Sequence, residues 1–181
     1  MKKLYIALVI CVPVFLYCLA RGLVLSMTHD ESSTFINFVS RPFWLIVTND
    51  PPSANNHLLN TLLIKLSTII SDTSFFVRLP NLVASAFCLF FTYKFVTQFY
   101  KKWHGILLGL SILVLNQYQL EFFSLARGYG LSLSFMMGSL YFIQRFLQRE
   151  RERERERERN THIGIQLIDG DTCCLQQSHN A

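Results

Sequence analysis

The chain has 181 residues, of which 51% are hydrophobic and 14% aromatic. Its long apolar segments exclude an ordinary soluble domain and predict an integral membrane protein. The net charge of +5 does not indicate a nucleic-acid partner, because the basic residues lie at segment ends or inside one repeat and form no basic face with interleaved aromatic residues. The five cysteines form neither a disulfide framework nor a set at zinc-binding spacing.

Four segments are predicted to cross the membrane as helices: residues 4–26, 79–99, 105–120 and 129–147. A spanning helix needs about 20 residues to cross about 30 Å of hydrocarbon. The first segment follows two lysines, as in a signal peptide, but it is long enough to span and lacks a clear cleavage site. We therefore expect it to remain as the first transmembrane helix.

The segment 57–70 decides the orientation of the later spans. It carries His57, Asn60 and Lys65, and it is short and polar for a spanning helix. If it does not cross, the basic residues that flank the spans all lie on the cytoplasmic side: Lys2, Lys3, Lys101, Lys102, Arg145 and Arg149. The positive-inside rule favours this arrangement. The predicted fold class is therefore an all-α polytopic membrane protein with four transmembrane helices, a cytoplasmic N-terminus and an external first loop over residues 27–77.

The external loop is rich in apolar side chains. The residues around Phe43 and Trp44 predict helices that lie in the membrane interface, with Trp44 at the depth of the lipid headgroups. Residues 50–53, with the sequence Asp-Pro-Pro-Ser, predict a turn. The segment 57–70 then forms a second interfacial helix.

Residues 149–159 alternate strictly between arginine and glutamate, and residues 160–181 form a polar tail that we expect to be disordered. One interpretation of the repeat is a solvated helical extension, in which pairs three residues apart attract. Another concerns the gene, because a GA dinucleotide tract encodes this alternation and is prone to slippage. We then expect the tail to be an out-of-frame end and the intact protein to continue with more spans. The nucleotide sequence across the repeat decides between these interpretations.

Before the repeat the chain has only five acidic residues, and two of them, Asp30 and Glu31, are adjacent just after the first span. Carboxylates are expensive near lipid, so this pair is the leading candidate for chemistry. The competing interpretation makes Asp30 the N-cap of a helix that begins at Glu31, whose charge is favourable in the first turn. The two roles are compatible, since a capping carboxylate can also face a substrate.

Several cationic side chains are predicted on the same external side. His57 and Lys65 are two turns apart on one helix face, where they either contact an anionic headgroup or anchor the interfacial helix. Arg78 is predicted to anchor the outer end of the second span. Arg127, at the outer ends of the third and fourth spans, either pairs with Glu121 or binds phosphate, whose oxygens a guanidinium matches in a bidentate way.

Together these side chains predict a site for a phosphate-linked lipid at headgroup depth. A carboxylate would take a proton from an acceptor hydroxyl, and the cations would stabilise the departing phosphate. A divalent cation between the paired carboxylates is unsupported, because two adjacent side chains do not make a site. Neither a metal nor another cofactor is therefore predicted.

The order of the motifs resembles a known family. An uncleaved first span leads to the Asp-Glu pair, interfacial helices follow, and two short motifs come later. The first opens the second span and the other follows the third: Phe76-Val77-Arg78-Leu79-Pro80-Asn81-Leu82 and Ala126-Arg127-Gly128-Tyr129. Over roughly residues 1–148 this order resembles the membrane-embedded GT-C glycosyltransferases, in the style of protein O-mannosyltransferases, aminoarabinose transferases and their uncharacterised bacterial relatives.

The resemblance implies inverting transfer of a sugar from a polyprenyl-phosphate donor to a glycan, lipid or protein acceptor at the external membrane face. It implies that Asp30 is the general base, that Glu31 supports it, and that Arg127 and Tyr129 contact the donor phosphate or shape the active site. Relatives have many more spans and a soluble outer domain, so we expect this 181-residue form to be inactive alone.

The chain contains no Asn-x-Ser/Thr sequence that would point to the eukaryotic secretory pathway, so we expect a multi-pass protein of a bacterial inner membrane. The alternative function is a small transporter subunit or a non-enzymatic membrane protein. That alternative predicts functional charges at mid-membrane depth rather than at one interface.

Overall fold

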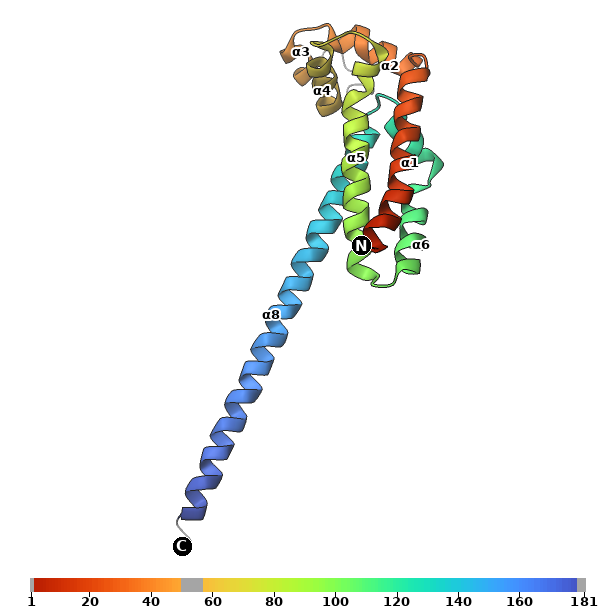
Figure 1. The fold of residues 1–181 in the computed structure, drawn as a ribbon. Coiled ribbons are helices and arrows are strands. Elements are labelled where there is room, and N and C mark those ends of the chain that lie inside the picture. The colour runs from red at the N-terminus through yellow and green to blue at the C-terminus, as the bar shows by residue number, and fades with distance from the viewer. Residues whose placement is uncertain (1, 50–56, 179–181) are drawn as a thin grey trace. The chain divides into compact units, whose positions relative to one another are not determined.

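The computed structural model describes the backbone of residues 2–49 and 57–178, and the side chains of residues 3–49 and 57–160. Within these ranges every regular element is a helix, which confirms the all-α prediction (Figure 1). The chain divides into two compact units, Met1–Tyr141 and Phe142–Ala181, and the boundary falls inside the last helix. The turn predicted over residues 50–53 lies outside the described residues.

Three helices lie side by side in the first unit: α1 (Lys2–Val24), α5 (Ser74–Phe99) and α6 (Trp103–Val114) (Figure 1). Small and branched apolar side chains fill the space between them: Ala7, Leu89, Val96, Ile106, Leu110 and Val114. Both α1 and α5 are long and apolar enough to cross a membrane, because at about 1.5 Å per residue each exceeds about 30 Å. The first two predicted spans therefore correspond to helices of spanning length.

The third predicted span, residues 105–120, is not one straight helix. It is divided between α6 and α7 (Gln117–Ser124), which are bent by 60° relative to each other. The side chain of Asn116 accepts a hydrogen bond from the backbone N–H of Tyr118 at 3.0 Å, so this residue begins a new helix. The pair supplies a third crossing only if the two bent helices act as one span.

The helix α8 runs from Tyr129 to Ser178. Its first turns pack within the first unit, where the Ser134 hydroxyl donates to the carbonyl of Ala84 at 2.5 Å. Among the described residues, α8 is not one of the helices that are long and apolar enough to span, so the fourth span stays a prediction. The helix continues through the exposed Arg-Glu repeat, where Arg153 and Glu150 pair three residues apart at 2.9 Å. It also includes residues predicted to be disordered, because adding turns to an existing helix costs little.

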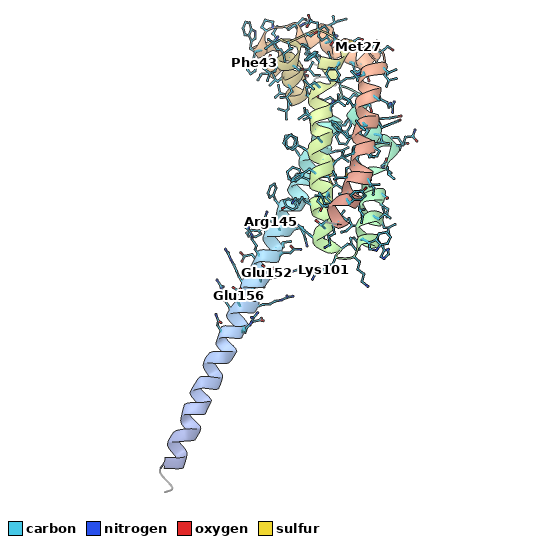
Figure 2. The ribbon with its side chains drawn as sticks, in the orientation of Figure 1. Met27, Phe43, Lys101, Arg145, Glu152 and Glu156 are labelled. Carbon is cyan, nitrogen blue, oxygen red and sulfur yellow. The ribbon has the colours of Figure 1, made fainter. Side chains whose placement is uncertain are left out.

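Four short elements gather where α1 ends and α5 begins (Figure 1). They are α2 (His29–Thr34), the π-helix η1 (Phe35–Val39), α3 (Phe43–Thr48) and α4 (Leu58–Thr68). Figure 2 shows Met27 at this end of the first unit and Lys101 at the other. The predicted interfacial helices therefore exist as helices, and α3 exposes Phe43 and Trp44 by 60% and 65%, as an interfacial element requires.

A proline lies inside α5 without interrupting it. Pro80 has no N–H to donate to the carbonyl of Phe76, one turn earlier. The Ser67 hydroxyl of α4 donates to that carbonyl instead, at 2.7 Å. This replacement bond joins α4 to α5 and keeps the helix that carries Arg78 and Asn81 intact.

Candidate functional site

The start of α2 sets the positions of the two adjacent acids. Thr28 is the N-cap, and its hydroxyl accepts from the backbone N–H of Glu31 at 3.4 Å. The Glu31 carboxylate accepts from the Thr28 N–H at 2.8 Å in return, which completes a capping box. The interpretation of Asp30 as the N-cap is therefore wrong, because the cap lies two residues earlier and leaves the Asp30 carboxylate available for another partner.

Glu31 forms a buried ion pair with Arg78 of α5. The exposed fractions of these two residues are 1% and 0%. The Arg78 Nε donates to one carboxylate oxygen at 2.8 Å, and Nη2 donates to the other at 2.7 Å. This bidentate geometry is the strongest that a guanidinium and a carboxylate can form.

Every polar atom of this buried pair has partners. The Arg78 nitrogens also donate to three carbonyls at the end of α1, those of Gly22, Leu25 and Ser26, at 3.2, 2.7 and 2.8 Å. The Glu31 carboxylate also accepts from the backbone N–H of Ala126 at 2.6 Å. The sequence predicted that Arg78 anchors the outer end of the second span, but the side chain is buried. It joins α1, α2 and α5 in the interior.

The surroundings of Glu31 keep it ionised. Burial alone would raise the pKa of its carboxyl, but the hydrogen bonds from Arg78, Thr28 and Ala126, together with the guanidinium charge, lower it below the ordinary value of 4.5. A buried charge that is fully paired has no vacant acceptor position for a substrate. Glu31 can thus support Asp30 only through the backbone that it holds.

Asp30 pairs with Arg127, which lies between α7 and α8. The Arg127 Nη2 donates to the Asp30 carboxylate. This pair is half-exposed, with side-chain exposed fractions of 40% for Asp30 and 37% for Arg127. Arg127 therefore pairs with the predicted base rather than with Glu121, the partner that sequence proximity suggested. The structure brings two predicted site residues together from positions 97 apart in the chain.

His57 and Tyr129 lie next to the same segment. Their rings meet edge to face with centroids 5.2 Å apart. Gly128 separates Arg127 from Tyr129, and a Cβ at this glycine would lie 2.6 Å from the His57 Cβ. Only glycine permits this close approach without displacing His57. Three predicted site residues, Arg127, Tyr129 and His57, are therefore brought to one short segment of the chain around Gly128.

Lys65 does not join this group. Its ammonium donates to the carbonyls of Val39 and Arg41 at 2.7 and 2.8 Å, where the α2–η1 segment ends. A lysine that satisfies final carbonyls of a helical segment stabilises that end. Lys65 thus holds together residues of the segment between α1 and α5, and its predicted contact with a substrate stays a prediction.

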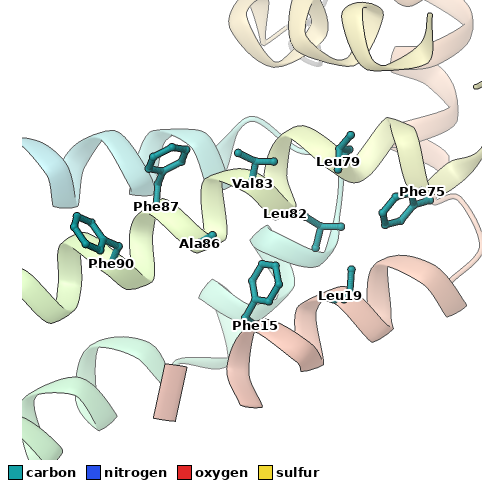
Figure 3. Close-up of a pocket in the computed structure, with 9 residues that line it drawn as sticks. All are labelled: Phe15, Leu19, Phe75, Leu79, Leu82, Val83, Ala86, Phe87 and Phe90. Carbon is teal, nitrogen blue, oxygen red and sulfur yellow. The ribbon is translucent and has the colours of Figure 1, made fainter. Parts of the chain in front are cut away.

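Two apolar grooves run beside α5. The groove between α1 and α5, shown in Figure 3, has a volume of about 460 Å³ and is lined by Phe15, Leu19, Phe75, Leu79, Leu82, Val83, Ala86, Phe87 and Phe90. A groove of about 630 Å³ is lined by residues of α4, α5 and the first turns of α8. Leu79, which follows Arg78 in the chain, lines both grooves.

Two residues that reach the site were not predicted as site residues from the sequence. Asn60 of α4 and Asn81 of α5 both donate to the backbone around Arg127. Their signal in the sequence was an asparagine amide among the leucine-rich and aromatic residues of the two helices. In the part of the chain that the structure describes, no three histidine, cysteine, aspartate or glutamate side chains are grouped so that they could hold a metal ion.

The fold and the site together define a helical protein with spanning-length helices and an acid–arginine site at one end of its first unit. No protein-family model, curated protein or solved structure matches the chain.

Proposed function

We propose that this chain binds a polyprenyl-phosphate-linked sugar and carries the base of an inverting glycosyltransferase at the external membrane face. The observation that supports this most is the half-exposed pair of Asp30 and Arg127. It offers a carboxylate and a guanidinium at one accessible point, and both are supported by buried structure. The motif order described above supplies the reaction class.

In the proposed reaction Asp30 takes the proton of an acceptor hydroxyl. The acceptor oxygen forms a bond to the anomeric carbon, and the bond from that carbon to the phosphate oxygen breaks. Polyprenyl phosphate leaves with the electron pair, and Arg127 stabilises its charge. The Arg127 side chain is 37% exposed, so its guanidinium can meet a phosphate while it donates to Asp30. Its Nε is buried and has no hydrogen-bond partner among the described residues. Tyr129 and His57 would border the sugar or phosphate.

The apolar grooves support a lipid-linked donor. Leu79, the chain neighbour of Arg78, lines both, and hydrocarbon and aromatic side chains make up almost all of their lining. A polyprenyl chain fits such a surface chemically. Because lipid tails are as apolar as these side chains, the grooves would hold the chain by van der Waals packing and not by a hydrophobic driving force. With the bilayer as solvent, the chain could lie along α5 while its phosphate reaches Arg127.

The proposed arrangement in the membrane has four spans, a cytoplasmic N-terminus and residues 27–77 outside. The bent α6–α7 pair would serve as the third span and the beginning of α8 as the fourth. We place the protein in a bacterial inner membrane. The acceptor class, a glycan, lipid or protein hydroxyl, stays open in this proposal.

A binding experiment tests this proposal without requiring turnover. Turnover is not expected from the 181-residue chain alone. The full chain in nanodiscs is titrated with a polyprenyl phosphate and, separately, with the corresponding uncharged polyprenol. We expect the phosphate to bind more tightly. Arg127→Gln should weaken phosphate binding by about tenfold or more, since a hydrogen bond to a charged group contributes about 1.5–3 kcal/mol.

Arg21→Gln is the matched control, because Arg21 lies in the last turn of α1 and contacts Tyr17 instead of an acid. It should leave binding unchanged. Equal affinity for phosphate and polyprenol, or equal losses in the two arginine variants, would refute the assignment of Arg127. Where a longer active form is obtained, Asp30→Asn should abolish consumption of the lipid-linked sugar and retain binding.

A further inference from the structure

The segment that carries Arg127 is not helical and connects α7 to α8. Leu125 ends α7 with φ −116° and ψ 150°, and α8 begins at Tyr129. Ala126 in this segment is only 3% exposed. Its polar backbone groups need partners other than helical ones, because unpaired buried groups cost about 1–3 kcal/mol each.

Two asparagines from other helices provide most of these partners. The Asn81 side-chain nitrogen donates to the carbonyls of Leu125 and Arg127 at 2.7 and 2.9 Å. The Asn60 side-chain nitrogen donates to the carbonyl of Ala126 at 3.0 Å. Three consecutive carbonyls are thus fixed by two amides, and the Ala126 N–H is fixed by Glu31.

Both asparagines are buried in the fold. Asn60 is 2% exposed and Asn81 is 0% exposed. Neither side-chain oxygen makes a hydrogen bond to any described residue, so each amide acts within the protein only as a donor. The backbone at Gly130 packs closely against Asn81 and leaves its amide little room to move. A Cβ at Gly130 would lie 3.1 Å from the Asn81 Oδ1 and 3.0 Å from the Phe122 carbonyl oxygen.

We propose that Asn60 and Asn81 are positioning residues that hold the Arg127 guanidinium against Asp30. Asn81 binds the carbonyl of Arg127 itself, and Asn60 binds the residue before it. Together they fix the direction in which the Arg127 side chain leaves the backbone. Without them the carbonyls of Leu125, Ala126 and Arg127 lose these amide donors, and Arg127 would separate from Asp30.

A competing explanation gives both asparagines a purely stabilising role. Either role predicts that their loss lowers the unfolding temperature. Only the positioning role predicts that Arg127 changes its state while the buried pair of Glu31 and Arg78 does not. Arg78 therefore serves as an internal reporter, since it is 0% exposed and becomes accessible only when the surrounding helices separate.

The test measures the reaction of each arginine with phenylglyoxal, resolved by peptide mass spectrometry, on the full chain in detergent micelles. The Asp30→Asn variant sets the rate for an Arg127 without its acidic partner. In Asn81→Leu and Asn60→Leu the Arg127 rate should rise several-fold toward that reference, with Arg78 still unreactive. Asn37→Leu is the matched control, because the Asn37 amide donates to the Ser33 hydroxyl one turn earlier in an exposed hydrogen bond and does not contact the Arg127 segment. It should match the wild type.

Two results would overturn the proposal. In one, Arg127 keeps its wild-type rate in the folded Asn81 and Asn60 variants. In the other, Arg78 becomes reactive together with Arg127 in every variant, which assigns the asparagines to general stability. If Asn81→Leu does not fold, Asn81→Ser retains one hydroxyl donor and, with Asn60→Leu, decides the question.

A role of the two asparagines in phosphate binding rests on the proposed function. Their hydrogen bonds to the Arg127 segment do not depend on it. If the wild-type chain fails to bind a polyprenyl phosphate, the proposed function fails while the arginine reactivities still decide the role of the asparagines. If it binds, Asn81→Leu should weaken binding as Arg127→Gln does. Unchanged binding in a variant with a reactive Arg127 would separate the positioning from the proposed function.

Discussion

Two adjacent carboxylates of α2 pair with two arginines, and the pairs lie in opposite environments. Glu31 and Arg78 are fully buried and have side-chain exposed fractions of 0%, whereas Asp30 and Arg127 are 40% and 37% exposed. The buried pair uses all its donors and acceptors inside the protein. The exposed pair leaves surface for a ligand. The first turn of α2 thus directs Glu31 into the interior and Asp30 toward the candidate site.

This difference teaches how a charged site can be supported beside lipid. The buried pair fixes the end of α1, the start of α2 and the backbone of Ala126. Because Ala126 precedes Arg127, the buried pair also sets where the exposed arginine begins. In the proposed function, the exposed pair exchanges its partners for substrate atoms while the buried pair keeps the fold.

The largest expected effect follows from removing one partner of the buried pair. Arg78→Met should destabilise the protein by about 3–5 kcal/mol, because it leaves the Glu31 charge buried and unpaired. Chemical denaturation in detergent measures the change. The double variant Glu31→Leu with Arg78→Met should recover part of the loss. An Arg78→Met protein as stable as the Arg21→Met control would contradict the buried-pair assignment.

Acid should weaken the buried pair for a related reason. The pKa of Glu31 is lowered in the folded state from its ordinary value of 4.5. The unfolded chain therefore binds the proton first, so the stabilisation is present above pH 4.5 and is lost as the pH falls through the folded pKa. Unfolding temperatures measured downward from pH 6 should decline below pH 4.5, and the decline should be shallower in Glu31→Gln. Identical slopes would show that other acids cause it.

A smaller effect is expected from the glycine beside the exposed pair. Gly128→Ala places a methyl group 2.6 Å from the His57 Cβ, and overpacking of this kind costs about 1–3 kcal/mol. The segment must shift, so phosphate binding through Arg127 should weaken as well. Gly138→Ala is the control, because its new methyl group would meet Phe91 at an ordinary 3.5 Å. Equal unfolding free energies for the two variants would show that the contact between Gly128 and His57 does not require glycine.

The smallest expected effect on stability is that of Asp30→Asn. A pair that is more than one third exposed contributes about 0.2–1 kcal/mol, and salt screens it. The variant should therefore unfold within about 1 kcal/mol of the wild type, and high salt should reduce even that difference. A loss as large as that of Arg78→Met would mean that the two pairs are equivalent, and it would end the comparison.

Much of the fold could be predicted from the sequence. The lengths of the apolar runs gave α1 and α5 as spanning-length helices, and the short polar segment 57–70 gave the separate helix α4. The third span was wrong as a single helix, because hydropathy cannot register the capping bond of Asn116. The Thr28-x-x-Glu31 capping box can be recognised in the sequence, but Asp30 was interpreted as the N-cap because aspartate is also favoured at that position.

The composition and the order of apolar and charged segments determined that the protein is helical and that helices of spanning length are present. They also singled out Asp30, Glu31 and Arg127 as candidates. Only the tertiary structure decided which acid meets which arginine. Arg78 lies 47 residues from Glu31, and Arg127 lies 97 residues from Asp30, so no local pattern specifies either pair. Burial then separates their roles, because a carboxylate enclosed by donors is fixed in the fold, while its half-exposed neighbour can still meet a substrate.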